Sequence, residues 1–347
     1  MKILITGNLG YVGPVVVKYL RDKYKNVSII GYDTGYFAHC LTNSAVLPET
    51  LLDTQFYGDL RDFPSGLLDG VDGLIHLAAI SNDPMGNQYK DVTEEINFNA
   101  SLKIAKLAAQ AGIKNYIFAS SCSMYGSVEG PPRTEEDSLM PLTTYAKSKA
   151  AMEKELSKLQ TSMNITCLRF ATACGMSPRL RLDLVLNDFV ACALTSNEIT
   201  VLSDGSPWRP LIEVNDMARA IDWALFRGGN NGGQYLAINA GSSAWNFQVN
   251  DLANAVAAVI PGVNISINKD APPDKRSYSV DFSLFEKLAP DHQPKAQMSQ
   301  VIKSLIKGIS GMGLDKSNFR DSEYMRLKVL QKHIDEGRLN SRLFWKN

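Results

Sequence analysis

The stretch Lys2-Ile-Leu-Ile-Thr-Gly-Asn-Leu-Gly-Tyr-Val-Gly13 opens the chain and decides its fold. A short apolar run that favours a β-strand is followed by three glycines and by a segment of helical periodicity to about Lys23. Glycines let a backbone turn tightly and approach a diphosphate, and free N–H groups at a helix amino end attract the anion. The spacing, Gly-x-x-Gly-x-x-Gly, predicts either a dinucleotide-binding turn or a plain glycine-rich turn between strand and helix.

An acidic residue after the second predicted strand favours the dinucleotide site. Residues 27–32 form a β-rich run that ends at Asp33, about 20 residues beyond Gly13. A carboxylate there can bond both ribose hydroxyls of an adenosine and would repel a 2′-phosphate. The two features at this separation predict a site for NAD rather than NADP.

The composition excludes several classes of protein. The 347 residues carry 36 basic and 36 acidic side chains, so no basic field argues for a nucleic-acid or membrane partner. No apolar stretch approaches the roughly 20 residues that cross a bilayer, and the chain does not open with a signal peptide. Scattered histidines argue against a metal site, and scattered cysteines suit free thiols in a reducing compartment. We therefore expect a soluble cytoplasmic protein. The cysteines are Cys40, Cys122, Cys167, Cys174 and Cys192.

Further strands are predicted at residues 55–58, 73–81 and 114–120, with small or polar residues near their carboxyl ends. Asp59 follows the first of these strands and can accept a hydrogen bond from an adenine amine. Ala78 and Ala79 are small enough for a cofactor to lie close over them. His76 is predicted to be a core residue. Ser121 stands at the end of the last of these strands and is expected to face the ligand crevice.

Tyr145 and Lys149 lie four residues apart on a predicted helix that Thr143 or Thr144 caps. Residues at this spacing share one helix face, so an ammonium can sit beside the path of a phenol proton. The pKa of tyrosine is about 10, and a neighbouring cation favours the phenolate. The pair alone also fits an amphipathic surface helix, so its catalytic interpretation depends on the cofactor site and on Ser121.

The sequence resembles the extended short-chain dehydrogenase/reductase family, in particular its nucleotide-sugar epimerases and dehydratases. The matching residues follow the family's order and spacing over the first half, and weaker matches continue to about residue 300. They are Gly7, Gly10, Gly13, Asp33, Asp59, His76 to Ala79, Ser121, Tyr125, Gly126, Tyr145 and Lys149. The resemblance implies an α/β fold, with a doubly wound parallel Rossmann sheet and a smaller discontinuous C-terminal substrate lobe.

The implied domain boundaries divide the chain into three parts. Residues 1–173, to which 210–239 return, would bind NAD, and residues 174–209 and 240–310 would form the substrate lobe. Residues 315–347 carry an amphipathic helical pattern and are expected to pack on their own lobe as an extension. The helices at 93–111 and 143–160 are expected, by resemblance, to form the four-helix interface of a homodimer.

The resemblance also implies residue roles. Tyr145 would be the acid/base, Lys149 would hold the nicotinamide ribose and lower the pKa of the tyrosine, and Ser121 would bond the reacting sugar hydroxyl. Tyr145 would take a hydroxyl proton, usually at sugar C4 in this family, while the hydride passes to NAD. The implied cofactor-binding residues are Gly7, Gly10, Tyr11, Val12, Gly13, Asp33, Asp59, Leu60, Leu77, Ala78, Ala79, Asn97, Tyr145 and Lys149.

The implied substrate is a nucleotide-diphosphate sugar. Asn187, Arg209 and Arg276 resemble the family's diphosphate-binding residues, and the strand that contains Val201 resembles one whose backbone reads the base. The full set of implied substrate-binding residues is Ser81, Ser121, Ser123, Thr172, Asn187, Val201, Arg209 and Arg276.

The favoured function is an NAD-dependent nucleotide-sugar epimerase that acts through a transient ketone. The first alternative is a net oxidoreductase, a nucleotide-sugar 4-dehydrogenase or ketosugar reductase with the same residues. A 4,6-dehydratase is disfavoured, because Cys122 and Ser123 stand where family dehydratases carry an Asp-Glu pair. A non-catalytic NAD-binding regulator is expected to have lost Tyr145, Lys149 or Ser121, and all three are present.

Overall fold

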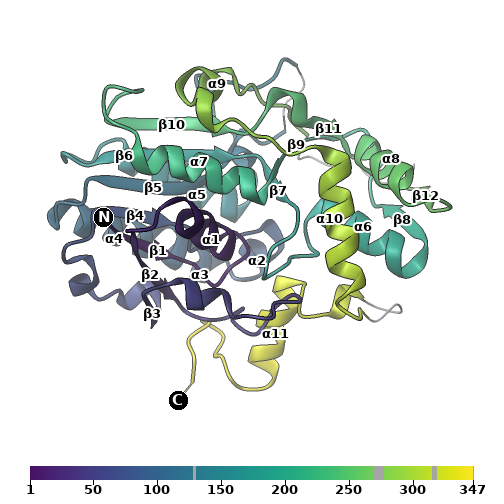
Figure 1. Cartoon of the computed structure of the whole chain (residues 1–347), viewed down its shortest axis with the longest axis horizontal. Coiled ribbons are helices and arrows are strands. Elements are labelled where there is room, and N and C mark those ends of the chain that lie inside the picture. Colours follow the sequence, from purple (N-terminus) through teal and green to yellow (C-terminus); the bar gives the residue numbers. More distant parts are fainter. Residues whose placement is uncertain (128–129, 269–276, 315–318, 347) are drawn as a thin grey trace.

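A parallel sheet of seven strands forms the centre of the computed structural model, which describes residues 1–127, 130–268, 277–314 and 319–346. The strand order is β10-β6-β5-β4-β1-β2-β3, and every neighbouring pair is parallel (Figure 1). The order reverses between β1 and β4, the switch point at which open α/β sheets bind ligands. The predicted doubly wound sheet is confirmed. Its strands are β1 (Lys2–Thr6), β2 (Ser28–Asp33), β3 (Thr54–Tyr57), β4 (Gly73–His76), β5 (Asn115–Ser121), β6 (Asn164–Phe170) and β10 (Tyr235–Ala240).

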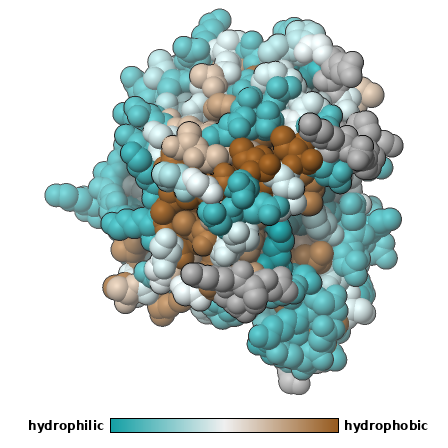
Figure 2. Space-filling model, turned by 90° about the vertical axis from the view of Figure 1, so that its right-hand side faces the viewer, coloured by the Kyte–Doolittle hydropathy of each residue, from teal (hydrophilic) through white to brown (hydrophobic). Residues whose placement is uncertain are grey.

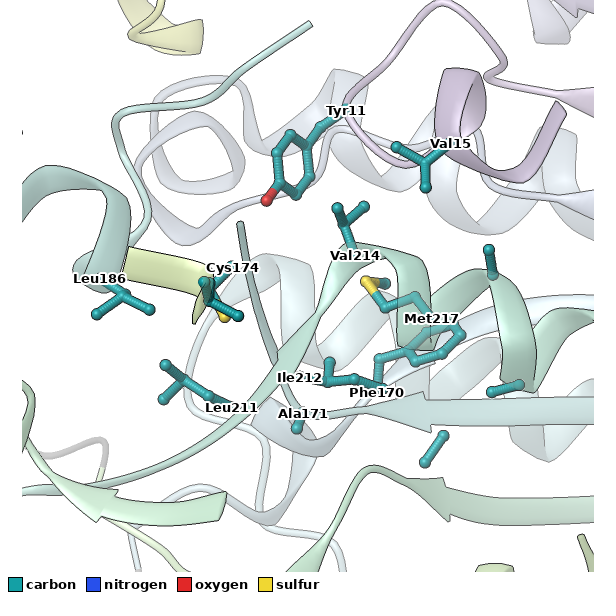
Figure 3. Packing of buried hydrophobic residues seen from close by; sticks show 14 of the residues in the cluster. Tyr11, Val15, Phe170, Ala171, Cys174, Leu186, Leu211, Ile212, Val214 and Met217 are labelled. Atoms are coloured by element: carbon teal, nitrogen blue, oxygen red, sulfur yellow. The ribbon is translucent and has the colours of Figure 1, made fainter. Parts of the chain in front are cut away.

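Alternating side chains of β1 divide the core into two layers. Ile3 and Ile5 belong to a buried cluster with α1 (Gly13–Lys23) and α7 (Val214–Phe226). Leu4 belongs to a second cluster with α4 (Ser101–Gln110) and α5 (Thr144–Leu156). Figure 3 shows the first layer from close by, with Val15 of α1 above Met217 of α7. Both faces of the central strands are therefore covered, which explains why β1 and β4 are almost continuously apolar, whereas the edge strand β3 is mostly exposed.

The helix predicted at residues 93–111 is interrupted by one wide turn. It begins as α3 (Lys90–Glu94), continues as a π-helical turn (Glu95–Ala100) and ends as α4. π turns are rare and often lie at functional sites. Here the wide turn carries Asn97, whose side chain reaches the loop after β4.

Most of the remaining elements gather beyond the carboxyl ends of the strands of the large sheet, whereas α9 (Ser283–Leu288) packs beside β10 and α7. Two small sheets have the orders β11-β9-β7 and β12-β8. The predicted division into two lobes stays a prediction. These elements are β7 (Thr172–Cys174), β8 (Glu198–Val201), β9 (Trp208–Glu213), β11 (Asn246–Gln248), β12 (Asn264–Ile267), α2 (Asp83–Gln88), α6 (Val185–Ser196), α8 (Val249–Val259), α9 (Ser283–Leu288) and α10 (Met298–Ser310). Across the described residues, no helix is long and apolar enough to cross a membrane.

The amphipathic pattern of the C-terminal segment predicted that it packs on its own lobe. The structure instead places part of it against the first domain. Its helix α11 (Arg326–Asp335) places Leu330 in the same buried cluster as Tyr36 and Leu60, and Leu339 and Leu343 follow it there. Figure 1 shows this segment running below β2 and β3, at the edge of the seven-stranded sheet. The expectation that it packs on its own lobe is wrong, because its apolar face finds a partner at the edge of the first domain.

Candidate active site

A cavity of about 1120 Å³ lies at the carboxyl ends of the parallel strands. Its walls come from the glycine turn, from the ends of β2, β4, β5 and β6, and from α6 and β9 on the other side. Figure 2 turns the side of the molecule with α6 and α10 toward the viewer, and apolar residues gather near the middle of that face with hydrophilic ones around them. The volume is large for a single small ligand, so the cavity has room for two.

The glycine turn is shaped by contacts that exclude side chains. Gly7 has φ +79°, and a Cβ there would lie 2.5 Å from the backbone nitrogen of Ala78. A Cβ on Gly13 would lie 2.3 Å from the carbonyl oxygen of Asn8, so Gly13 brings α1 against the turn and does not itself line the cavity. The predicted residues Gly7, Gly10, Tyr11, Val12, Leu77, Ala78 and Ala79 do line it.

Asp33 is fixed by backbone N–H groups at the end of β2. Its carboxylate accepts hydrogen bonds from Leu9 N at 3.0 Å and from Gly35 N at 2.7 Å. Burial raises the pKa of this carboxyl, and the two backbone hydrogen bonds oppose that rise. Asp33 lines the cavity beside the glycine turn, the position that the predicted ribose contact requires.

Two predicted cofactor residues are turned away from the cavity. The carboxylate of Asp59 is held by Arg61, with 2.8 Å from Nε to Oδ1, and Leu60 rather than Asp59 lines the cavity. The amide of Asn97 accepts a hydrogen bond from Ile80 N at 2.8 Å and donates one to Ile80 O at 3.0 Å. Neither side chain is placed for the predicted contact; Asp59 orders its own turn, and Asn97 anchors the loop after β4.

Tyr145 and Lys149 occupy neighbouring turns of α5, whose first turn Thr143 caps by accepting a hydrogen bond from Ala146 N at 3.1 Å. Burial raises the pKa of Tyr145 to about 12, and a hydrogen bond with Ser121 partly opposes this rise. The ammonium of Lys149 lies 5.7 Å from the centre of the Tyr145 ring. All three residues line the cavity, so the structure brings the predicted catalytic group together.

Lys149 does not lower the pKa of Tyr145 in the way that the resemblance implied. Its ammonium donates to the carbonyl oxygen of Ala119 at 2.6 Å and lies 4.5 Å from the centre of the Phe118 ring. Burial lowers the pKa of Lys149 to about 7. Desolvation therefore shifts both groups toward their neutral forms, and this outweighs the attraction that their spacing predicts.

The two residues after Ser121 point in different directions. The thiol of Cys122 is fully buried and donates to the carbonyl oxygen of Arg169 at 3.0 Å, and burial raises its pKa. Ser123 lines the cavity, with its hydroxyl 2.9 Å from that of Ser121. Of this pair, only Ser123 is therefore placed to meet a ligand.

The predicted substrate residues separate in a similar way. Ser81, Thr172 and Arg209 line the cavity, whereas Val201 is fully buried and its neighbours in the chain take its place there. Asn187 is also fully buried; its amide accepts from Gly175 N at 3.0 Å and donates to the carbonyl oxygen of Arg181 at 2.9 Å. The diphosphate contact predicted for the Asn187 side chain is not the contact that it makes. Arg276 lies outside the described residues.

Arg181 is a cavity residue that the sequence reasoning missed. Its Nη1 donates to the hydroxyl of Ser81 at 3.2 Å, and its Nε donates to the carboxylate of Asp183 at 2.8 Å. Its positive charge partly opposes the rise that burial causes in the pKa of Tyr145. The run Arg179-Leu-Arg-Leu-Asp183, with three charges in five residues, was the available signal. Three further lining residues, Arg320, Met325 and Arg326, come from beyond the predicted lobes and carried no such signal.

The chain's residues fit NAD. Gly7 and Gly13 allow the chain to turn closely, and the small side chains of Ala78 and Ala79 leave room for a cofactor at one wall. The Asp33 carboxylate lies beside the place that an adenosine ribose would occupy. Within the described residues, no group of three or more histidines, cysteines or acids is placed to hold a metal ion.

A doubly wound sheet with a glycine turn at its switch point and a Ser-Tyr-Lys group in one cavity defines a dinucleotide-binding α/β enzyme. A sequence model of the NAD dependent epimerase/dehydratase family matches residues 3–241, and the chain belongs to that family. This confirms the predicted family, the use of NAD and the class of enzyme, an NAD-dependent member of the epimerases and dehydratases.

Individual relatives have different named activities. YtcB of Bacillus subtilis (strain 168), called an uncharacterized UDP-glucose epimerase, is 30% identical over 235 residues, 65% of this chain and 72% of YtcB. UDP-glucuronic acid decarboxylase 6 of Arabidopsis thaliana is 27% identical over 311 residues, 86% of each chain. The solved UDP-glucuronic acid 4-epimerase of Bacillus cereus, in complex with UDP-glucuronic acid and NAD, has a TM-score of 0.75 at 22% identity, over 90% of this chain and 99% of that one, which supports the fold.

Proposed function

We propose that the chain is a nucleotide-sugar epimerase that oxidises a sugar hydroxyl, at C4, to a transient ketone and then reduces the ketone from the other face. The observation that carries this proposal is that Ser121, Tyr145 and Lys149 lie together in the cavity wall, with Lys149 on the next turn of α5 after Tyr145. NAD, when bound, accepts the hydride from the carbinol carbon and later returns it.

The protein's own groups handle the proton. In its phenolate form, Tyr145 takes the hydroxyl proton as the carbon–oxygen bond becomes a carbonyl, and it gives the proton back when the ketone is reduced. Ser121 donates to the same sugar oxygen and holds it against the phenol. A pKa of about 7 lets Lys149 gain or lose a proton near neutral pH, so its charged form is proposed to favour the phenolate of Tyr145, while the substrate proton stays on the phenol until the ketone is reduced.

The same cavity would bind the cofactor and the sugar nucleotide side by side. The glycine turn and Asp33 are proposed to hold the dinucleotide, with the diphosphate at the amino end of α1. Arg209, whose Nη1 donates to the carbonyl oxygen of Trp208 at 2.9 Å, is proposed to bind the diphosphate of the sugar nucleotide, with Ser81 and Thr172 near the sugar.

The experiment is a product analysis with several UDP-sugars as probes. Purified protein is incubated with UDP-glucose, UDP-N-acetylglucosamine or UDP-glucuronic acid, and the nucleotide sugars are separated while the absorbance of reduced nicotinamide is followed. An epimer that forms without lasting absorbance change supports the proposal. An accumulating reduced cofactor would instead show a net oxidoreductase.

A decarboxylase is the second candidate, because the match to UDP-glucuronic acid decarboxylase 6 spans 86% of this chain. It shares the first step, since a ketone at C4 of a uronic acid is a β-keto acid and loses carbon dioxide readily. Release of carbon dioxide from UDP-glucuronic acid would select this candidate over the epimerase. A 4,6-dehydratase is disfavoured, because Ser123 is a poor acid and Cys122 is turned into the core.

We also propose a cytoplasmic homodimer that pairs the helices near 93–111 and 143–160. A shallow groove on α4, lined by Leu102, Lys106 and Leu107, lies on the proposed surface. All five cysteines are buried free thiols, which suits a reducing compartment. Light scattering coupled to gel filtration tests the dimer; a monomer mass at micromolar concentration contradicts it.

A further inference from the structure

The C-terminal strap, residues 319–346, lies outside the part of the chain that matches the family model and yet borders the cavity. It begins beside α6, where Arg320 donates to the carboxylate of Asp188 at 2.9 Å. It then crosses to the edge formed by β2 and β3, as Figure 1 shows. The strap therefore connects the two sides of the cavity through a path that the family match does not include.

Arg326, the first residue of α11, is buried in the cavity wall. Its side chain is 1% exposed, stacks on Phe37 at 4.8 Å and donates to the carbonyl oxygens of Arg179 at 2.9 Å and Glu323 at 3.3 Å. Among the residues described, no carboxylate lies within ion-pair distance of it. Burial lowers its pKa. Its other neighbours are the Phe37 ring and the neutral thiol of Cys40. A buried guanidinium that has only neutral partners is a costly charge, and an anion in the cavity would compensate it.

The strap also ties down the loop that follows Asp33. Trp345 Nε1 donates to the carbonyl oxygen of Thr34 at 2.7 Å, and the hydroxyl of Tyr36 donates to that of Leu343. His333 Nε2 lies 2.9 Å from the carbonyl oxygen of Tyr36 and donates to it. Thr34 and Tyr36 line the cavity next to Asp33, so these bonds hold one wall of the predicted adenosine site.

A second group of contacts holds the turn after β3. The ring of Phe344 lies 3.4 Å from the guanidinium carbon of Arg61, and Arg61 Nη1 donates to the carbonyl oxygen of Arg342 at 2.8 Å. Arg61 in turn binds Asp59 and Glu95. Leu60 of this turn lines the cavity. The strap therefore holds both the loop after β2 and the turn after β3, which border the predicted adenosine site.

We propose that the C-terminal strap is part of the dinucleotide site: its last residues clamp the two adenosine-side loops, and Arg326 supplies a cation to the diphosphate from the cavity wall. This rests on the cofactor site in the proposed function and extends it. Release of the cofactor then requires the clamped loops to open, so NAD stays bound from one turnover to the next. That behaviour suits a reaction that returns its hydride.

The clamp is tested with the double variant Phe344→Ala/Trp345→Ala in the full-length protein. Bound NADH is mixed with excess NAD, and its release is followed by fluorescence. We expect release to be about tenfold faster than in the wild type, with the KM for the sugar nucleotide unchanged. Phe226→Ala is the control, because it removes an aromatic ring of similar exposure, 50% against 40% for Trp345. Phe226 packs on Tyr24, away from the cavity. Equal release rates in the double variant and the wild type overturn the clamp.

The cation is tested with Arg326→Met and Arg326→Lys. We expect Arg326→Met to raise the Kd of NAD about tenfold and to flatten its dependence on salt, and Arg326→Lys to restore part of both. Wild-type affinity in Arg326→Met overturns the assignment of the cation. If Arg326→Met does not fold, as its thermal transition would reveal, a wild-type Kd and salt dependence in Arg326→Lys overturn it instead.

The clamp and the proposed function fail in distinguishable ways. A wild-type protein that retains NADH but converts no sugar nucleotide contradicts the proposed epimerase and leaves the clamp standing. A wild-type protein that makes an epimer while the double variant releases NADH at the same rate contradicts the clamp alone.

Discussion

The two ends of the cavity are built in opposite ways. At the catalytic end, Tyr145 is half-buried and Lys149 is buried, and desolvation moves the pKa of the first to about 12 and of the second to about 7. At the adenosine end, Asp33 accepts two backbone hydrogen bonds and Arg61 donates several, and the C-terminal strap contacts Arg61 and Thr34, the residue after Asp33. Proton transfer needs groups whose charge can change, whereas tight binding of a cofactor needs groups that stay in place.

Removing the phenol should break the catalytic end and leave the other end intact. In Tyr145→Phe we expect kcat to fall roughly a thousandfold, the scale of general acid–base catalysis, while NAD remains bound. Steady-state kinetics and the nucleotide content of the purified protein check this. Tyr57→Phe is the control, because Tyr57 is 67% exposed and does not line the cavity. A Tyr145→Phe enzyme within tenfold of the wild type would exclude the tyrosine as the base.

Replacing Lys149 should reveal its pKa through stability. Burial lowers that pKa from 10.5 to about 7, so between these pH values the unfolded chain binds more protons than the folded chain, and wild-type stability rises with pH. Lys149→Met lacks this dependence. We therefore expect the Tm of the variant, relative to wild type, to be higher near pH 6 than near pH 9, and kcat to fall roughly a hundredfold. Lys154→Met, at an exposed position of the same helix, should show no such pH dependence. An unchanged difference in Tm between the two pH values would contradict the lowered pKa.

A change at Asp33 should weaken the adenosine end and spare the chemistry. Asp33→Asn keeps the size of the side chain but loses the charge that is proposed to bind the ribose hydroxyls. We expect the Kd of NAD to rise roughly 10- to 100-fold and the preference over NADP to shrink, with kcat at saturating NAD nearly unchanged. Calorimetric titration with both dinucleotides measures this, with the exposed Asp22→Asn as control. An Asp33→Asn variant that still prefers NAD over NADP to the wild-type extent would show that Asp33 does not bind the ribose hydroxyls.

The parts that sequence could predict are those that local spacing sets. The glycine turn, Asp33 at a strand end, and Tyr145 with Lys149 on one helix face each follow from the period of a single element. The parts that it could not predict depend on partners far along the chain. Asn97 and Asn187 have the right residue type, but backbone groups of other segments take up their amides.

Long-range contacts explain the remaining misses as well. The side chain of Arg326 meets Phe37 across almost the whole chain, and no periodicity in either segment indicates this contact. The amphipathic pattern of residues 315–347 indicated a helix, which the structure has at Arg326–Asp335, but the pattern could not say which surface that helix covers. Burial is also a tertiary property, so the spacing of Tyr145 and Lys149 predicted a lowered pKa for the tyrosine where desolvation raises it.

The smallest expected effect concerns the residue beside Ser121. Cys122 follows the catalytic serine in sequence, but its thiol points into the core and donates to the carbonyl oxygen of Arg169. In Cys122→Ala we expect kcat and KM to stay within about twofold of wild type, while the free energy of unfolding falls by about 1 kcal/mol because a small void forms. In Ser123→Ala the hydroxyl that supports Ser121 is lost, and we expect kcat to fall about tenfold. A large loss of kcat in Cys122→Ala, with wild-type kcat in Ser123→Ala, would mean that the thiol turns into the cavity during turnover. The catalytic end would then move during the reaction, unlike the adenosine end.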